Sequence, residues 1–128
     1  MPKITLLFAS LHVLLMLVLL ARISTHRHGH KIGLGDGGDL VLSRKVRVHG
    51  NFIEHAPVAL LMLGLLELCG LPALWLWVLG SVLLLGRVMH AAGLSRTAGY
   101  SVGRFWGTAM TWLALLLMAL AGIWIALA

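Results

Sequence analysis

Long hydrophobic runs alternate with short polar segments along the whole chain. Four of these runs approach the roughly 20 residues that an α-helix needs to cross a hydrocarbon layer about 30 Å thick. They cover approximately residues 4–23, 46–68, 71–94 and 105–127. Because little chain remains between them, the pattern predicts an all-α membrane protein in which residues 1–128 form one up-down bundle of four transmembrane helices.

The first run has features of a secretory signal peptide, since Lys3 precedes a continuous stretch of leucine-rich sequence. However, the stretch is long for a signal core and ends at Arg22 instead of a small-residue cleavage site. We therefore predict that this segment is a retained helix.

Composition supports the membrane assignment. Of the 128 residues, 60% are hydrophobic and only 11% are charged, and the mean hydropathy is +0.99. These values exclude both an ordinary soluble domain and a disordered chain. The net charge of +6 does not indicate nucleic-acid binding, because the basic residues lie at helix ends and no aromatic platform accompanies them.

Basic residues flank the first and third connections but not the second. They are Arg22, Arg27, Lys31, Arg44, Lys45 and Arg47 around the first, and Arg96 and Arg104 around the third. By the positive-inside rule these two connections are cytoplasmic and both termini lie on the opposite side. The short chain, without an organelle signal, favours a bacterial inner membrane.

The first connection, residues 24–44, is polar and rich in glycine, which predicts a mobile segment. His26, His28 and His30 alternate within it, but no cysteine or carboxylate joins them at the spacing of a zinc site. We interpret them as part of a solvated basic loop and predict no metal site. The single Cys69 cannot form an internal disulfide and is interpreted as a packing residue.

Charged residues interrupt the second and third runs, where lipid makes charge costly. Such residues usually face the interior of a bundle and serve a site. The tight connection Cys69-Gly70-Leu71-Pro72 makes these two helices antiparallel neighbours. Counted from residue 71, Glu54 and Arg87 both lie roughly 25 Å along their helices. We therefore predict that Glu54 and Arg87 pair inside a polar pocket, with the alternative that the pair only fixes helix register.

Side chains of two other residues extend the predicted pocket. Asn51 shares a stripe with Arg47 and Glu54, and His90 shares a face with Arg87, so both are placed to add hydrogen bonds. His49 points to a different face and is predicted to reach a neighbouring subunit.

The residues of these two helices resemble a known family. The run Arg47-Val-His-Gly-Asn51-Phe-Ile-Glu54-His-Ala-Pro57, together with Gly86-Arg87-Val-Met-His90, is similar to the MAPEG family, the membrane-associated proteins in eicosanoid and glutathione metabolism. The similarity covers almost the whole chain. It is fairly specific, because both halves must occur together at the right distance.

The resemblance implies a homotrimer that binds glutathione as co-substrate between subunits near the cytoplasmic side. Matched by position, the residues that would bind glutathione are Arg47, His49, Asn51, Glu54, Arg87 and His90. Arg104 matches a family arginine near the thiol and is the candidate catalytic residue. A guanidinium there would favour the thiolate, which is the nucleophilic form.

Two positions depart from the family pattern. Leu94 stands where eicosanoid-making members often have tyrosine, and Phe105 stands where a serine is common after the arginine. Neither side chain donates a hydrogen bond to sulfur. Three functions therefore stay open: a glutathione-dependent transferase or peroxidase acting on small lipophilic electrophiles from the lipid, a non-catalytic glutathione- or anion-binding or scaffold protein, and a small transporter or proton pathway.

Overall fold

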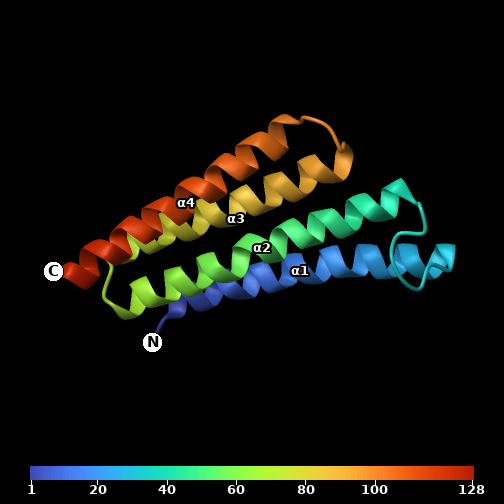
Figure 1. Ribbon diagram of the computed structural model, residues 1–128. Coiled ribbons are helices and arrows are strands. Elements are labelled where there is room, and N and C mark those ends of the chain that lie inside the picture. The colour runs from blue at the N-terminus through green and yellow to red at the C-terminus, as the bar shows by residue number, and fades with distance from the viewer.

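Four helices make up the computed structural model, which describes all 128 residues (Figure 1). They are α1 (Lys3–His30), α2 (Leu40–Leu68), α3 (Ala73–Arg96) and α4 (Val102–Leu127), and there are no strands. Each helix is long and apolar enough to cross a membrane. The predicted all-α, four-helix membrane fold is confirmed.

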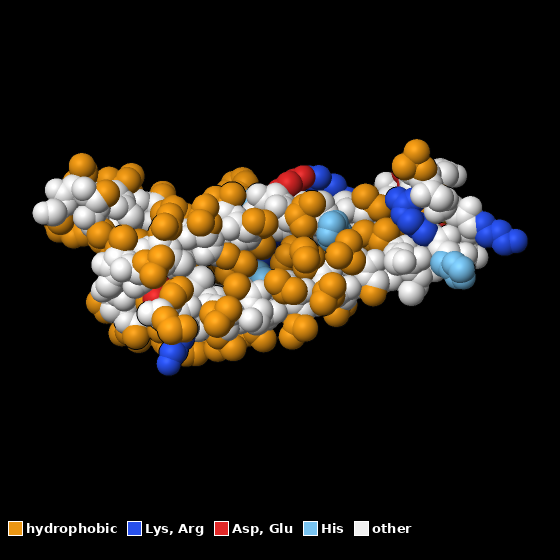
Figure 2. Space-filling view, turned by 90° about the horizontal axis from the view of Figure 1, so that it is seen from below, with side chains coloured by type: hydrophobic (Ala, Val, Ile, Leu, Met, Phe, Trp, Pro, Cys, Tyr) orange, Lys and Arg blue, Asp and Glu red, His pale blue; other side chains and the backbone are white.

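The helices form two antiparallel hairpins that lie side by side, α1 with α2 and α3 with α4 (Figure 1). Both termini and the α2–α3 turn lie at one end of the molecule. Connections 31–39 and 97–101 lie at the other, which we call the basic end. Figure 2 shows hydrophobic side chains over most of one face, with lysine, arginine and histidine mainly toward this end.

The first hairpin is longer than the hydrophobic pattern predicts. Helix α1 continues seven residues past the predicted end at residue 23, and α2 begins six residues before residue 46. Hydropathy detects only the part of a helix that suits hydrocarbon, whereas polar residues continue the same backbone hydrogen bonding in water. The predicted extent of the first connection, residues 24–44, is therefore wrong, and only residues 31–39 connect the helices.

Local signals fix the ends of this shorter connection. Lys31 ends α1 in the left-handed conformation with φ of 55°. The Asp39 carboxylate then accepts hydrogen bonds from the backbone amides of Val41 and Leu42, at 2.8 and 3.0 Å, which is the N-cap arrangement. These caps close α1 and α2 into a tight hairpin at the basic end.

A second cap joins the first turn of α1 to the last turn of α2. The Glu67 carboxylate accepts hydrogen bonds from the amides of Ile4 and Thr5 at 2.9 and 2.7 Å. These amides have no partner within α1, and a carboxylate also suits the positive end of a helix dipole. Glu67, a charged residue near the end of a hydrophobic run, thus has a structural role.

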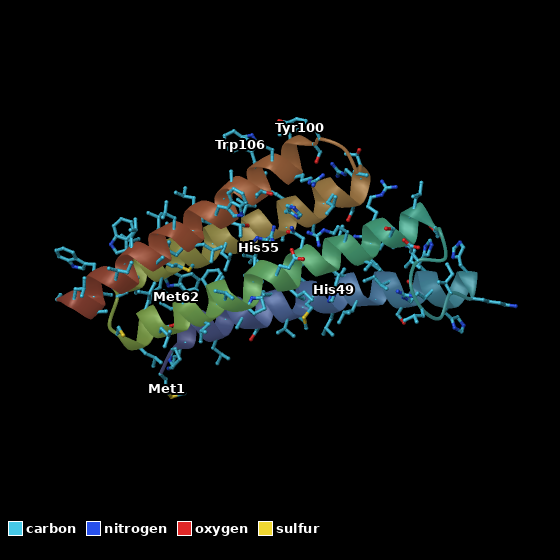
Figure 3. The ribbon with its side chains drawn as sticks, in the orientation of Figure 1. Met1, His49, His55, Met62, Tyr100 and Trp106 are labelled. Carbon is cyan, nitrogen blue, oxygen red and sulfur yellow. The ribbon has the colours of Figure 1, made fainter.

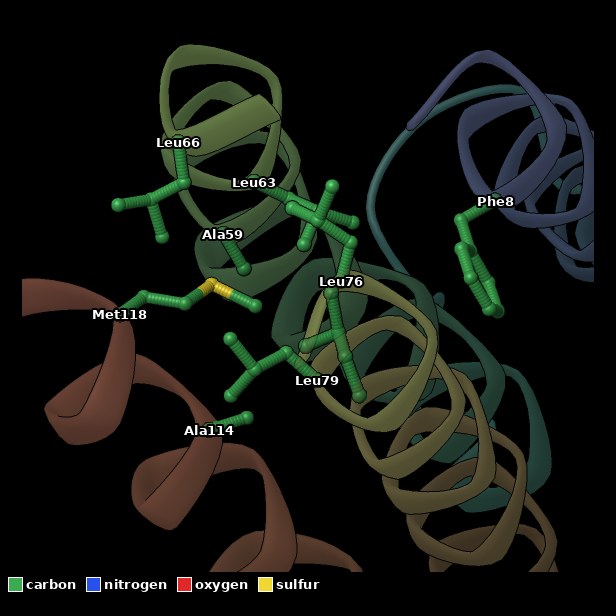
Figure 4. Packing of buried hydrophobic residues seen from close by; sticks show 9 residues of the cluster. Phe8, Ala59, Leu63, Leu66, Leu76, Leu79, Ala114 and Met118 are labelled. Atoms are coloured by element: carbon green, nitrogen blue, oxygen red, sulfur yellow. The ribbon is translucent and has the colours of Figure 1, made fainter. Parts of the chain in front are cut away.

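Two apolar clusters form the interior, and they differ in the helices that they join. The larger one draws on all four helices (Figure 4) and comprises Phe8, Ala59, Leu63, Leu66, Leu76, Leu79, Leu83, Ala114 and Met118. The smaller one, nearer the basic end, draws only on α1, α2 and α3 and comprises Leu19, Val48, Phe52, Ala56, Ala91 and Leu94. Consequently α4 separates from the α1–α2 hairpin toward the basic end (Figure 1).

Glycines bring α3 and α4 together at the basic end. A Cβ on Gly107 would meet backbone atoms of His90 and Gly86, and one on Gly93 would meet the backbone of Arg104. Contact at backbone distance is what small residues allow between membrane helices. Five glycines, Gly64, Gly80, Gly86, Gly107 and Gly122, each face another helix.

Candidate functional site

Arg87 joins α3 to α2 from within the bundle. Its side chain is buried, with only 2% of the residue exposed. Its Nη1 donates to the backbone carbonyl and to the side-chain Oδ1 of Asn51, at 3.2 and 3.0 Å. The buried Nε has no partner. Arg87 is therefore occupied with Asn51, and its guanidinium does not lie open to a ligand from outside.

Glu54 pairs with a different arginine. Its carboxylate accepts from Nη1 and Nη2 of Arg47 at 2.9 and 3.4 Å, and these side chains are 48% and 61% exposed. Arg87 makes no ion pair with any carboxylate. The predicted Glu54–Arg87 pair is wrong. No ion pair therefore supports a closed polar pocket between α2 and α3.

Helix geometry explains this difference. At about 100° per residue, Asn51 lies roughly 60° around α2 from Glu54, although the two share a broad stripe. The side of α2 that faces α3 presents Asn51, so Glu54 is turned outward. Equal depth along two helices therefore did not ensure contact, because contact also depends on how each helix is rotated about its axis.

His90 is a buried residue of α3, with only 4% exposed, one turn after Arg87. His55 was not among the predicted residues. Its Nδ1 bonds to the Asn51 carbonyl at 2.9 Å, and its position one turn after Asn51 was the available signal.

Arg104 lies in a different setting, at the start of α4. It is exposed, and its Nη1 donates to the carbonyls of Ala98 and Gly99 at 3.0 and 3.4 Å. It lines a cavity of about 380 Å³ together with Tyr100, Ser101, Phe105, Thr108, Ala109 and Trp112. Figure 3 shows Tyr100 and Trp106 on the outer side of α4, away from the α1–α2 hairpin.

Hydroxyl groups in this cavity offer what Leu94 and Phe105 lack. The Ser101 hydroxyl already accepts from the Arg104 amide, and Thr108 already donates to the Arg104 carbonyl. The Tyr100 hydroxyl makes no hydrogen bond within the chain. Leu94 itself is buried in the smaller apolar cluster, whereas Tyr100 lines the same cavity as Arg104.

The structure thus divides the predicted site residues into two groups within one chain. The α2–α3 group contains Arg47, His49, Asn51, Glu54, Arg87 and His90, and Arg104 belongs to the α4 cavity. They are exposed (Arg47, Glu54, Arg104), half-buried (His49, Asn51) or buried (Arg87, His90). Figure 3 labels His49 on α2, and its predicted contact with a neighbouring subunit stays a prediction.

The comparison with known families decides the identity of this four-helix unit. The sequence model of the MAPEG family matches residues 5–124, which is nearly the whole chain. The chain belongs to the MAPEG family. The match includes both charged helices and the start of α4, and it confirms the resemblance found in the sequence.

Two proteins similar to this MAPEG protein come from Escherichia coli. Inner membrane protein YecN of strain K12 is 35% identical over 118 residues, which cover 92% of this chain and 88% of the relative. The protein of the same name in strain O6:H1 CFT073 matches with the same values. No solved structure matches this MAPEG chain.

Proposed function

We propose that this MAPEG-family protein is a membrane-bound, glutathione-dependent transferase or peroxidase that acts on lipophilic electrophiles. The observation that carries the proposal is the presence of three exposed charged side chains, Arg47 and Glu54 on α2 and Arg104 on α4, on the outer surface of largely apolar helices. Charge on a surface that faces lipid or protein usually serves a site. The proposal does not depend on a contact between Glu54 and Arg87.

The chemistry of glutathione suits these side chains. Glutathione carries two carboxylates and one ammonium group, so its site needs cationic donors and an anionic acceptor. Arg47 and Glu54 supply one of each, and their mutual ion pair is open to exchange with a ligand because both side chains are about half exposed. Arg87 is a positioning residue. Its hydrogen bonds hold Asn51, which lies between Arg47 and Glu54 on α2.

Arg104 and Tyr100 are assigned to the glutathione sulfur. A guanidinium favours the thiolate over the thiol, and a phenolic hydroxyl donates a hydrogen bond to sulfur. The aromatic side chains of Phe105 and Trp112 line the same cavity. They suit an apolar second substrate that enters from the lipid.

A homotrimer with glutathione between subunits would unite the two groups of residues. Only 25 of the 128 residues are buried within one chain, and the Arg47–Glu54 pair lies on its outside. An ionised pair that faced hydrocarbon would be costly. Contact with the α4 cavity of a neighbouring subunit would remove that cost. It would also bring the Arg104 side chain of that subunit close to Arg47, Asn51 and Glu54.

Arginine substitutions separate the assigned roles. In detergent-purified protein, Arg104→Ala is expected to lower conjugation of glutathione to a nitroaromatic substrate by about 100-fold, because one charge-stabilising group is lost. Arg47→Ala is expected to weaken glutathione binding by about 10-fold, measured by calorimetry, because a charge-assisted hydrogen bond is lost.

Arg96→Ala is the matched control, since Arg96 is exposed near the same end and its side chain makes no hydrogen bond. Both activity and binding should stay at the wild-type level in this variant. Unchanged turnover in Arg104→Ala would refute the catalytic assignment.

A non-catalytic glutathione-binding protein is the second candidate, favoured by the burial of Leu94 where some members have a hydroxyl donor. This function predicts saturable glutathione binding without product across a broad panel of electrophiles. Detection of a glutathione conjugate that disappears in Arg104→Ala would contradict it.

We further propose that the protein lies in a bacterial inner membrane with both termini on the non-cytoplasmic side. The distribution of basic residues favours this orientation, and the similarity to inner membrane protein YecN favours this membrane. Cys69 tests this orientation, since it is the only cysteine, is exposed and lies at the end that carries both termini. A membrane-impermeant maleimide added to intact spheroplasts is expected to label Cys69 from outside the inner membrane. Labelling only after lysis would show the opposite orientation, and the Cys69→Ala variant measures the background labelling.

A further inference from the structure

We propose that His26, His30 and Asp39 form a binding site for a divalent transition-metal ion of the zinc class at the basic end. One possible ligand atom from each of these side chains lies within 4.8 Å of the others. Two histidines one turn apart on α1 thus meet a carboxylate from the start of α2. Imidazole nitrogens and a carboxylate oxygen are common zinc ligands, and three protein ligands leave a fourth position for water.

The fold places the carboxylate of Asp39 beside the histidines, which the spacing in the sequence did not predict. Helix α1 carries His26 and His30 on one face because it continues to His30, and the short connection returns Asp39 to the same place. His26 Nε2 lies 2.7 Å from Asp39 Oδ2, and the two imidazole rings stack with centroids 4.1 Å apart. His28, two residues from each histidine, lies on another face of α1 and does not belong to the cluster.

His30 is already held in the form that a metal needs. Its Nδ1 lies 3.0 Å from the backbone carbonyl of His26, to which it donates a hydrogen bond. The proton is therefore on Nδ1, and the lone pair on Nε2 is free. Metal-binding histidines usually have their second nitrogen fixed by such a bond.

Asp39 provides the negative charge of the site. Its Oδ2 lies 2.7 Å from His26 Nε2, and the backbone amides of Val41 and Leu42 approach the other side of the carboxyl group. The carboxylate has a second oxygen, Oδ1, that accepts from these amides. Asp39 can thus cap α2 through Oδ1 while Oδ2 binds an ion.

Lys45 opposes the metal and gives the proposal a directional test. Its Nζ lies 3.0 Å from His26 Nδ1 and donates to it, which leaves the His26 proton on Nε2, facing Asp39. On metal binding this proton would move to Nδ1, the Nε2 lone pair would bind the ion, and the Lys45 ammonium would turn to water.

The experiment is a zinc titration of the full chain, purified in detergent without a polyhistidine tag and stripped with a chelator. Isothermal calorimetry is expected to show one Zn²⁺ per chain. His30→Ala and Asp39→Asn should each weaken binding by at least 10-fold, whereas His28→Ala should leave it unchanged. Asparagine is chosen because it keeps the N-cap of α2. Lys45→Met should tighten binding several-fold.

Circular dichroism of every variant shows whether the helices are retained. Equal weakening by His28→Ala and His30→Ala would overturn the proposal, because it would indicate non-specific binding to exposed histidines. The absence of stoichiometric binding to the wild-type protein would overturn it as well. Glutathione turnover plays no part in these measurements, so the result is independent of the proposed enzymatic function.

Discussion

Gly107→Ala is expected to lower the thermal midpoint of the purified protein by roughly 10 °C. The added methyl group would meet backbone atoms of His90 and lie 2.6 Å from the carbonyl oxygen of Gly86. Backbone cannot rotate away as a side chain can, so α3 and α4 must separate. We expect a cost of about 3 kcal/mol, at the upper end for overpacking, which exceeds the gain of about 1 kcal/mol from better helix propensity.

Gly29→Ala is the matched control for this substitution. Gly29 lies in the last turn of α1, and a Cβ there would meet no atom within 4 Å. The same change should leave the midpoint unchanged or raise it slightly, because only helix propensity acts. Circular dichroism in detergent measures both variants, and equal midpoints for Gly107→Ala and Gly29→Ala would show that the two helices do not depend on this contact.

Arg87→Met is expected to weaken glutathione binding by about 10-fold while leaving the helical fold intact. Arg87 does not face the ligand in the proposed site, but its two hydrogen bonds hold Asn51, which lies between Arg47 and Glu54 on α2. Methionine fills much of the same volume, so it avoids the cavity that alanine would leave, although Asn51 loses its hydrogen-bond partner. The loss should therefore appear mainly in ligand binding, and the thermal midpoint should fall less than in Arg87→Ala.

Two further variants define what this result means. Arg87→Ala should also lower the free energy of unfolding, by about 2 to 4 kcal/mol, because it leaves a cavity and an unpaired Asn51. Arg22→Met is the control, since Arg22 also joins two helices, through a 2.8 Å bond from Nη1 to the Ser95 hydroxyl, but lies apart from the α2 stripe. Normal glutathione affinity in Arg87→Met would remove Arg87 from the site.

Hydropathy predicted the helices well and their ends poorly. The four apolar runs correspond to α1 to α4, yet the first connection was placed at residues 24–44 instead of 31–39. The polar ends of α1 and α2 carry no hydropathy signal, and they are stabilised by caps and by contacts between the helices. The interpretation of His26 and His30 as loop residues was wrong for the same reason.

For the candidate site, the sequence identified which residue types to examine but not which of them meet. Arg87 contacts Asn51, and Glu54 contacts Arg47, although depth alone matched Glu54 with Arg87. Likewise, no spacing rule joined Asp39 to His26, which lie 2.7 Å apart. These contacts depend on the rotation of each helix and on how connections return, which a one-dimensional pattern does not contain.

The sequence by itself determined the membrane setting, the number of helices, their antiparallel order and the family, because length, hydropathy and local motifs carry this information directly. Only the tertiary structure decided which face of α2 meets α3, how closely α3 approaches α4 through Gly86 and Gly107, and which charges are buried. The physical reason is that hydrocarbon selects apolar helices without regard to their rotation. Rotation is fixed by packing between side chains that lie far apart in the chain.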